Sequence, residues 1–326
     1  MKSAIIGLGV IGKLHARVLA SQNKDIIALC DIIPEAAERI GAQFAPDSAI
    51  YTDYIEMLEC EKPDVVHVCT PHYLHAEMVI AALERGINVL CEKPLCIKRE
   101  DIGRILDAEQ NSTARLGVCH QNRYLEVNAF VKEYLADKKI VGAHGTVAWS
   151  RGADYYNSAE WRGTQEQEGG GVLINQALHT LDLVQWFCGE PTEVVASKDT
   201  LMLADVIEVE DTLSARYFGE NPFSFFATNC APCNFSVQIN ILLSNKEKLT
   251  VLPGALLIND EVKMHKGQTR VLGKACYGNG HEALIADFYD CVSAGRHFEL
   301  DGAEGAKVVR MILAAYESNG ERVSVR

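Results

Sequence analysis

The sequence is notable first for what it lacks. No apolar run approaches the roughly eighteen residues of a membrane-spanning helix. The 31 Lys and Arg residues are outnumbered by 44 Asp and Glu, and the resulting formal charge of −13 argues against a polyanion such as nucleic acid as a partner. Internal repeats and low-complexity linkers are also missing. What remains is a globular composition, 48% hydrophobic and 23% charged, in 326 residues, which is long enough for two domains.

The cysteines do not form a ligand pattern. Cys230 and Cys233 have C-x-x-C spacing, but no convincing second pair follows, so we expect no metal site. The other cysteines, such as Cys30 and Cys69, are scattered through apolar stretches and are typical of small core residues in a reducing compartment. Because the chain starts directly with a strand pattern and shows no secretory signal, we expect a cytoplasmic protein with no membrane partner.

The clearest motif lies at the start, where an apolar run breaks into Gly7-Leu8-Gly9-Val10-Ile11-Gly12. A strand that turns through G-x-G-x-x-G into a helix holds the pyrophosphate of a dinucleotide on backbone N–H groups. A second strand pattern ends at Asp31, 24 positions after Gly7, near the spacing expected for an acid that binds the adenosine ribose. A tight turn and a helix-capping Asp are the alternative, but the strand–turn–helix context favours a nucleotide site.

The order of the predicted elements indicates two domains. Residues 1–121 alternate β-rich and helical patterns, which predicts an α/β doubly wound parallel sheet. Residues 122–326 read as an α+β domain with an open, mostly antiparallel sheet, interrupted by a helix over Val172–Phe187. Ligands of doubly wound sheets bind at the carboxyl ends of the strands, so we expect the site there, with the second domain as its opposite wall.

Polar residues follow three of the predicted strands. Thr70-Pro71 ends one strand, Glu92-Lys93-Pro94 the next, and the last runs into His120-Gln121. Lys93 is the sharpest candidate, because a lysine at a strand end can place a cation near a substrate oxygen or transfer a proton. A solvated surface lysine is the alternative interpretation.

A second cluster lies in the helix predicted over Val172–Phe187. On a helix Asn175 and His179 are four residues apart, and Asp182 follows three later, so the three side chains can share one face. A histidine on an apolar helix is usually a core residue, but polar partners on both sides favour a functional role.

These motifs together resemble the glucose–fructose oxidoreductase/inositol dehydrogenase (Gfo/Idh/MocA) family. The matching pieces are, in order, G-x-G-x-x-G-x-x-H, T-P-x-x-x-H, E-K-P, N-R-Y, W-R-G and G-G-x-x-x-N-x-x-x-H-x-x-D. The resemblance implies a Rossmann domain followed by a larger domain on an open sheet that often makes oligomer contacts. It also implies NAD(H) or NADP(H) chemistry on a secondary alcohol of a sugar, cyclitol or related polyol.

The motif and the resemblance together assign site residues. The cofactor-binding set, for NAD with NADP as the alternative, comprises Gly7, Gly9, Val10, Ile11, Gly12, Asp31, Ile32, Thr70, Pro71, His75, Glu92, Lys93 and Gln121. Within it the resemblance lets Thr70, Pro71 and His75 line the cofactor cleft, and lets Glu92 and Lys93 flank the nicotinamide ribose. Lys93, His179 and Asn175 are the catalytic candidates.

Asn175 departs from the family pattern, since many dehydrogenases of the family carry Asp there. A neutral amide supplies only a hydrogen bond to the histidine, which leaves open whether Lys93 or His179 takes the proton. The substrate side offers planar donors and aromatic faces suited to polyols, with simple packing as the alternative. These residues are Arg151, Tyr155, Tyr156, Trp161 and Arg162, with Lys93, Asn175 and His179 also facing the substrate.

The sequence therefore predicts a cytoplasmic NAD(H)-dependent oxidoreductase that interconverts a secondary alcohol and a ketone. Two alternatives stay open, a glycoside hydrolase of the same fold that uses NAD transiently, and a dinucleotide-binding regulator without catalysis. The expected partner is a small sugar or polyol, and we expect a homo-oligomer, a dimer or tetramer, through the sheet of the C-terminal domain.

Overall fold

The computed structural model describes residues 1–266 and 279–326, which divide into two compact units. The first unit holds Met1–Gln121 and the described part of 270–306, and the second holds the described part of 122–269 and Lys307–Arg326. The sequence assigned all of 122–326 to the second domain, whereas residues 279–306 belong to the first unit. The physical reason is burial: Phe288 of helix α9 (Gly280–Ala294) packs where Gly117 has no side chain.

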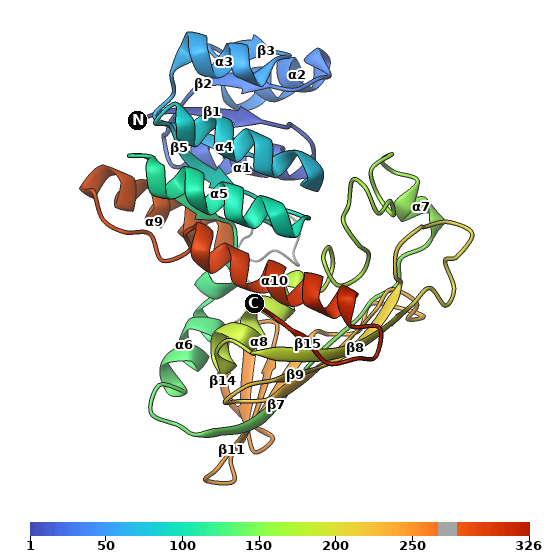
Figure 1. The fold of residues 1–326 in the computed structure, drawn as a ribbon. Helices are drawn as coiled ribbons and strands as arrows, with labels where there is room; N and C mark the ends of the chain where they lie inside the picture. Colours follow the sequence, from blue (N-terminus) through green and yellow to red (C-terminus); the bar gives the residue numbers. More distant parts are fainter. Residues whose placement is uncertain (267–278) are drawn as a thin grey trace. The chain divides into compact units, whose positions relative to one another are not determined.

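The first unit is built on a parallel sheet in the strand order β3-β2-β1-β4-β5-β6 (Figure 1). Its strands are β1 Lys2–Ile6, β2 Asp25–Cys30, β3 Ala49–Tyr51, β4 Val65–Val68, β5 Asn88–Cys91 and β6 Leu116–Val118. This is the strand order of a doubly wound dinucleotide-binding fold. The strands β2 and β3 are added on one side of β1, and the chain then crosses over to add β4, β5 and β6 on the other side, so the switch point lies between β1 and β4. The loops that follow β1 and β4 therefore frame the crevice where such folds bind ligands. The predicted parallel α/β class is confirmed.

Helices connect these strands and cover the sheet. They are α1 Val10–Ser21, α2 Pro34–Phe44, α3 Tyr54–Glu61, α4 His75–Glu84, α5 Arg99–Asn111 and α9, with short 3₁₀ turns at His72–Leu74 and Gln121–Tyr124. Local chemistry sets several of their ends. The Asp53 carboxylate accepts the N–H groups of Ile55 and Glu56 at the start of α3, and Gly86 follows α4 with a positive φ of 70°.

The second unit is built on a mixed sheet in the order β14-β13-β12-β11-β7-β10-β9-β8-β15. The strands are β7 Ile140–Ala148, β8 Glu193–Asp199, β9 Thr212–Phe218, β10 Phe223–Thr228, β11 Gln238–Leu243, β12 Lys248–Leu252, β13 Ala255–Ile258, β14 Glu261–His265 and β15 Val323–Ser324. Within the described part of this second sheet, β7 and β10 run parallel to each other, and the other neighbouring strands are antiparallel. The predicted open, mostly antiparallel sheet is confirmed.

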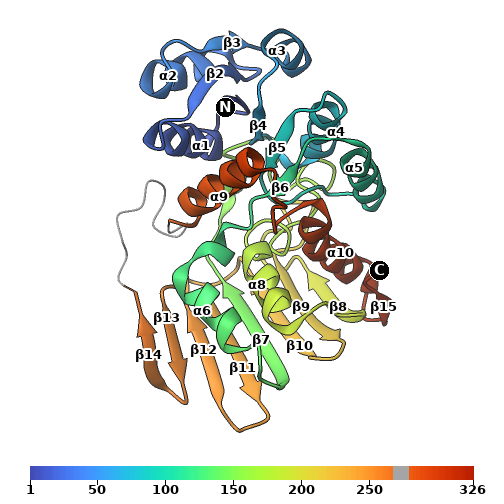
Figure 2. The same ribbon diagram turned by 90° about the vertical axis from the view of Figure 1, so that its left-hand side faces the viewer.

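One face of this sheet carries helices. These are α6 Glu126–Tyr134, α8 Leu178–Cys188 and part of α10 Gly302–Ser318, while the short α7 Ala153–Tyr156 lies in a loop (Figure 2). Gly145 of β7 makes the contact with α8 close, because a Cβ there would lie 2.7 Å from Phe225 and 3.0 Å from Val184. No helix among the described residues is both long and apolar enough to cross a bilayer.

The helix expected over Val172–Phe187 is shorter than predicted. Residues 172–177 form successive turns, and the α-helix proper begins at Leu178. The buried Glu210 carboxylate accepts the N–H groups of Gly171 and Leu173 at 2.8 and 3.0 Å and so caps the first of these turns. The Ala177 N–H then bonds to the Val172 oxygen five residues back, at 2.9 Å, which separates these turns from the helix. Asn175 therefore lies before the helix. The prediction that Asn175 and His179 lie one turn apart on the same face of one helix is wrong.

Candidate active site

The glycine loop after β1 has a separate steric reason for each glycine. Gly7 has a φ of 85°, and a Cβ on it would lie 2.8 Å from the carbonyl of Cys69 after β4. A Cβ on Gly12 would lie 1.9 Å from the Gly7 oxygen, so only glycine lets α1 pack this close to the loop. Gly9 differs, because the space around its missing side chain is open. These are the three roles expected of a dinucleotide loop.

The N-terminus of α1 is suited to an anion. Gly9 is the N-cap residue and makes no side-chain capping bond, and the first turn carries no acidic residue. The first-turn N–H groups and the helix dipole therefore face the open space beside Gly9 without a competing carboxylate. Val10 is 61% exposed on this turn. The residues present fit a dinucleotide pyrophosphate.

Asp31 follows β2 at the same edge of the sheet and has a second task that the sequence did not reveal. Its Oδ2 accepts the N–H of Leu8 at 2.7 Å, and its Oδ1 accepts the N–H of Ile33 at 3.0 Å. The carboxylate therefore supports the glycine loop directly and brings the predicted ribose-binding acid next to it. Ile32 beside it is 87% exposed.

The residues that follow β4 divide into two kinds. Thr70 and Pro71 are half-buried, as a residue lining a cleft would be. His75 is fully buried instead, with Nδ1 at 2.7 Å from the Pro94 oxygen and Nε2 at 2.9 Å from the Thr70 oxygen. Burial lowers the pKa of His75. The implied role of His75 as a cleft-lining residue is corrected: it holds two loops together from inside.

Glu92 and Lys93 follow β5 and point to different surroundings. Lys93 is half-buried, whereas Glu92 is only 5% exposed. Its Oε1 contacts Nε2 of His15 at 3.0 Å and Nε2 of His281 at 3.1 Å, and its Oε2 accepts the Lys93 N–H at 3.2 Å. The carboxylate implied to flank the nicotinamide ribose is thus directed into the interior. Sequence reasoning missed His281, which lies 189 residues from Glu92.

Gln121, the last predicted cofactor residue, is also buried. It lies where the first unit's early sequence meets α9, since a Cβ on Gly280 would lie 2.2 Å from the Gln121 oxygen. Its backbone therefore helps to seat that helix.

In the second unit, three side chains converge on the hydroxyl of Tyr155. Arg162 donates through a guanidinium N–H, Asn175 through Nδ2 at 3.2 Å, and Gln176 through Nε2 at 3.0 Å. Arg162 also stacks over the Tyr155 ring, with its Cζ 4.4 Å from the ring centroid. The structure therefore brings together Tyr155, Arg162 and Asn175, three residues that the sequence placed in one site.

Asn175 has a second partner that the sequence did not single out. The Glu168 carboxylate is fully buried and accepts hydrogen bonds from Asn175 Nδ2 and from the N–H of Gly163. Glu168 precedes the three consecutive glycines, so an acid next to a glycine run was the available signal. The Asn175 amide donates to the buried Glu168 carboxylate. A neutral donor is therefore favoured at position 175 over an aspartate, whose charge would repel Glu168.

His179 is half-buried in the first turn of α8. Asp182, expected on its face, is buried and forms a bidentate ion pair with Arg123, with contacts of 2.9 and 2.5 Å. This pair fixes the N-R-Y segment to α8.

The other predicted substrate-side residues differ in exposure. Arg151 and Trp161 are half-buried, and Arg151 stacks on Tyr155 with its Cζ 5.4 Å from the ring centroid. Tyr156 is only 3% exposed, and its hydroxyl accepts from Asn229 at 2.7 Å. Its expected substrate contact is therefore corrected: it packs in a small core with Leu203, Ile207 and Val209.

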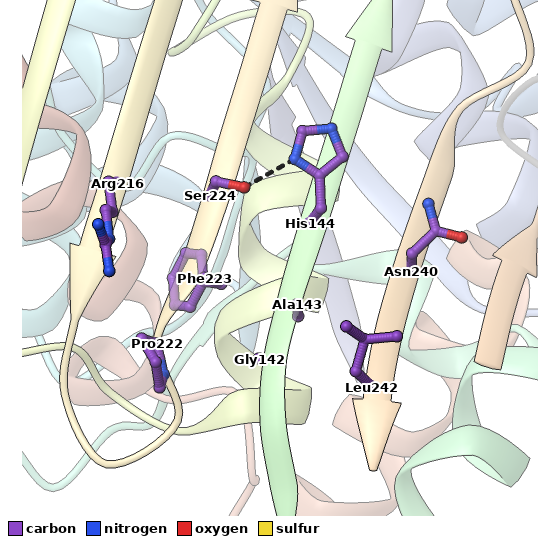
Figure 3. Close-up of a pocket in the computed structure, with 9 residues that line it drawn as sticks. All are labelled: Gly142, Ala143, His144, Arg216, Pro222, Phe223, Ser224, Asn240 and Leu242. Atoms are coloured by element: carbon purple, nitrogen blue, oxygen red, sulfur yellow. Dashed lines mark hydrogen bonds between the residues drawn. The ribbon is translucent and has the colours of Figure 1, made fainter. Parts of the chain in front are cut away.

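A separate hollow lies on the sheet face of the second unit that points away from α8. Alternation along β7 turns Gly145 toward α8 and His144 the other way. There His144 contacts the Ser224 hydroxyl at 2.8 Å, beside a cavity of 310 Å³ (Figure 3). The cavity is lined by Gly142, Ala143, His144, Arg216, Pro222, Phe223, Ser224, Asn240 and Leu242. None of the predicted site residues lines it.

Comparison with known proteins identifies the class and then the family. Residues 1–120 match the description "Oxidoreductase family, NAD-binding Rossmann fold", and residues 132–237 match the C-terminal domain of the same family. The first unit is an NAD-binding Rossmann domain. The chain belongs to the Gfo/Idh/MocA oxidoreductase family.

Named relatives extend over nearly the whole chain. An inositol 2-dehydrogenase of Salmonella typhimurium is 28% identical over 302 residues, which cover 90% of this chain and 87% of the relative. The WlbA dehydrogenase of Bordetella pertussis, solved with NADH and UDP-GlcNAcA, has a TM-score of 0.85 at 27% identity and covers 99% of this chain and 98% of its own. Levoglucosan dehydrogenase with NADH and levoglucosan has a TM-score of 0.86 at 23% identity, over 100% and 99% of the two chains, and shows the shared fold.

Proposed function

We propose that this protein is an NAD(H)-dependent dehydrogenase that interconverts a secondary alcohol and a ketone on a sugar, cyclitol or related polyol. The observation that carries the proposal is the glycine loop. Gly7 and Gly12 admit no side chain, while the space beside Gly9 is open next to unopposed helix N–H groups. Family membership supports the reaction class, and the named relatives act on or bind polyhydroxylated compounds.

The chemistry divides between cofactor and protein. NAD, when bound, accepts the hydride from the alcohol carbon, or NADH returns it in the reduction. In the proposal Gly7, Gly9, Gly12 and the first turn of α1, with Val10 and Ile11, hold the pyrophosphate, and Asp31 beside Ile32 receives the ribose hydroxyls. Lys93 or His179 removes the hydroxyl proton in the oxidation and returns it in the reduction.

The second unit supplies the proposed substrate contacts. Arg151, Tyr155, Trp161 and Arg162 present aromatic faces and guanidinium donors, and the half-buried positions of these residues support access to a ligand. Asn175, held by Glu168, has a fixed amide orientation. We propose NAD as the preferred cofactor, with the carboxylate of Asp31 disfavouring the 2′-phosphate of NADP.

The deciding experiment is a screen of polyols, cyclitols and sugar acids with NAD and NADP, followed by NADH absorbance. A dehydrogenase gives net absorbance change with at least one alcohol, and Lys93→Ala slows it by at least about 10²-fold. A glycoside hydrolase instead releases sugar from a glycoside with no net absorbance change and retains its NAD through gel filtration. A regulator binds NADH and turns over nothing; either result overturns the proposal.

We also propose a homo-oligomer through the open face of the second unit's sheet, and a cytoplasmic location. Leu242, 49% exposed beside the cavity of Figure 3, supports the first, and the free cysteines throughout the described residues support the second. Light scattering tests the oligomer: Leu242→Glu should lower the molar mass, and a monomeric wild type would contradict the proposal.

A further inference from the structure

Three buried groups from distant parts of the first unit meet at one carboxylate. His15 comes from α1, Glu92 from the end of β5 and His281 from the start of α9, and all three are almost completely buried. Both imidazole Nε2 atoms reach the same Oε1 of Glu92, at 3.0 and 3.1 Å. The other carboxylate oxygen accepts the N–H of Lys93. The carboxylate thus joins the two histidines on one side to the lysine backbone on the other.

The partners of Glu92 determine its charge. Burial alone would raise the pKa of this carboxyl, but the hydrogen bonds from His15 and His281 outweigh burial and hold the pKa well below its usual range. Burial lowers the pKa of His15, and it lowers the pKa of His67 further. At neutral pH the arrangement is therefore an ionised Glu92 beside neutral His15 and His67.

These charge states fix the hydrogen positions along the chain of contacts. An ionised Glu92 only accepts, so His15 donates through Nε2 and its Nδ1 accepts. The contact of 2.7 Å between Nδ1 of His15 and Nδ1 of His67 then requires the hydrogen on His67 Nδ1. Nε2 of His67 is left as an acceptor, 2.9 Å from the Tyr289 hydroxyl on α9.

We propose that Glu92 is a positioning residue for Lys93, and that His15 and His281 keep it ionised and correctly turned for this task. The backbone of Lys93 is held by an anion that cannot rotate without losing two buried hydrogen bonds. The mechanistic benefit rests on the proposed function, in which Lys93 acts on the reacting hydroxyl. The buried arrangement itself does not depend on it.

The same three side chains also have the chemistry of a metal site, with two imidazoles and a carboxylate within 4.8 Å of one another. Their direct N–O contacts of 3.0 and 3.1 Å have hydrogen-bond lengths, and our proposal takes both Nε2 hydrogens as donated to Glu92. The two assignments differ in an observable, because a ligating nitrogen carries no hydrogen.

The first test reads the imidazole hydrogens by ¹⁵N NMR at neutral pH, in protein treated with EDTA and again after equimolar Zn²⁺. We expect neutral His15 with its hydrogen on Nε2 and neutral His67 with its hydrogen on Nδ1, unchanged by Zn²⁺. A His67 hydrogen on Nε2, or loss of the His15 Nε2 hydrogen on adding Zn²⁺, would overturn the arrangement. This readout needs no turnover.

The second test is a double-mutant cycle between Glu92→Gln and Lys93→Ala, measured as kcat with NAD and the alcohol found in the screen. The carboxylate of Glu92 accepts three N–H groups, from His15, His281 and the Lys93 backbone. The amide group of a glutamine cannot accept a hydrogen bond through its nitrogen, so at least one of these contacts is lost and Lys93 is no longer held in position. When Lys93 is present, we expect Glu92→Gln to lower kcat by at least about tenfold. When Lys93 is already alanine, we expect the same substitution to lower kcat by less than about twofold. An equal loss in both backgrounds would show that Glu92 does not act through Lys93.

Substitutions at two histidines of the first unit, the buried His281 and the exposed His297, separate loss of a hydrogen bond from general misfolding. His281→Gln keeps an N–H donor and should retain more activity than His281→Leu, whereas His297→Leu alters an exposed histidine of the same unit and should have no effect. Equal loss in both His281 variants would contradict a hydrogen-bonding role. If Lys93→Ala keeps full turnover, the proposed function of Lys93 fails, and the NMR result still decides whether the buried arrangement exists.

Discussion

The two units prepare their ligand-binding residues by different means. In the first unit the loop after β1 owes its shape to missing side chains: Gly7 and Gly12 lie so close to neighbouring backbone that no Cβ fits. In the second unit the polar residues are held by side chains, with Tyr155 accepting from Arg162, Asn175 and Gln176. Constraints of the first kind are steric and act between backbone atoms, those of Gly12 against Gly7 and those of Gly7 against Cys69. The second kind is a network of hydrogen bonds between side chains, all of them within residues 155–176.

The difference predicts how each site responds to substitution. A backbone-shaped loop should fail abruptly where a side chain cannot fit and should tolerate change where space is open. A side-chain network should respond to charge, and compensating substitutions should restore it.

The largest effect is expected at the glycine loop. Gly12→Ala would bring a Cβ to 1.9 Å from the Gly7 oxygen, so α1 must move. We expect a loss of roughly 3 kcal/mol or more in unfolding free energy and no measurable NADH binding.

Gly9→Ala is the matched control: its Cβ meets no atom within 4 Å, so stability should change by less than about 0.5 kcal/mol. NADH affinity should still fall, since the new methyl occupies the open space. Thermal unfolding and NADH fluorescence separate the two effects, and equal melting temperatures for both variants would contradict the steric account.

The next effect concerns the proton-transfer candidates, one in each unit. Lys93→Ala should lower kcat/KM by at least about 10²-fold with the fold intact, and His179→Ala should behave similarly. If the two share one proton path, the double variant should lose far less than the product of the single losses. Fully multiplicative losses in steady-state kinetics would show that they act independently.

A smaller effect is expected at Asn175, and its expected direction changes once Glu168 is known. From the sequence alone, Asn175→Asp should preserve activity and raise the pKa of His179. In the structure it would set a second carboxylate against the buried Glu168, and the pair would retain a proton. A carboxyl pKa raised in the folded state means that the native state binds more protons than the unfolded state. Stability of the variant should therefore fall as pH rises above about 4, by roughly 2 kcal/mol at neutral pH.

The compensating substitution tests this account of Asn175. Asn175→Asp combined with Glu168→Gln restores one carboxylate and one amide, so urea unfolding at pH 5 and pH 8 should again resemble the wild type. If the double variant is as unstable as Asn175→Asp alone, charge repulsion is not the cause.

The smallest effect is expected at Asp31. We expect NADH to bind more tightly than NADPH, and Asp31→Asn to reduce that preference by about tenfold, because the negative charge near the 2′-position is removed. Asparagine keeps an oxygen that can accept the Leu8 N–H and loses only the exposed bond from the Ile33 N–H, which water can replace, so stability should change little. Titration of both cofactors by fluorescence measures the ratio, and a wild type that binds NADPH as tightly as NADH would refute the role of Asp31.

The sequence predicted the fold more fully than the site. The parallel sheet follows from alternating apolar runs and glycine turns, which are local patterns, and β5 ends at Cys91, directly before the Glu92-Lys93-Pro94 segment that the sequence placed at a strand end. The start of α8 was misplaced because the Ala177 N–H bonds to Val172 five residues back, after a turn that Glu210 caps from 39 residues away, and no local propensity reveals either contact. The expected single helix is therefore divided into a capped helical turn and α8.

Among the site residues, the glycine positions were predictable because sterics alone dictates them. The surroundings of Glu92 were not, since one partner lies in α1 and the other in α9. Asn175 differs, because its partner Glu168 lies only seven residues away and an acid before a glycine run was the available signal. Sequence motifs identify residue types that a site needs, but which groups face one another depends on long-range packing.

The late position of α9 in the chain has a consequence for synthesis. Its His281 completes the contacts of Glu92, its Tyr289 those of His67, and its Phe288 fills the space over Gly117. A ribosome finishes the six strands of the first unit long before it reaches residue 280, and makes strands β7 to β14 of the second sheet in between. The nucleotide-binding unit is thus the first to begin emerging and remains incomplete until nearly the entire polypeptide has been released.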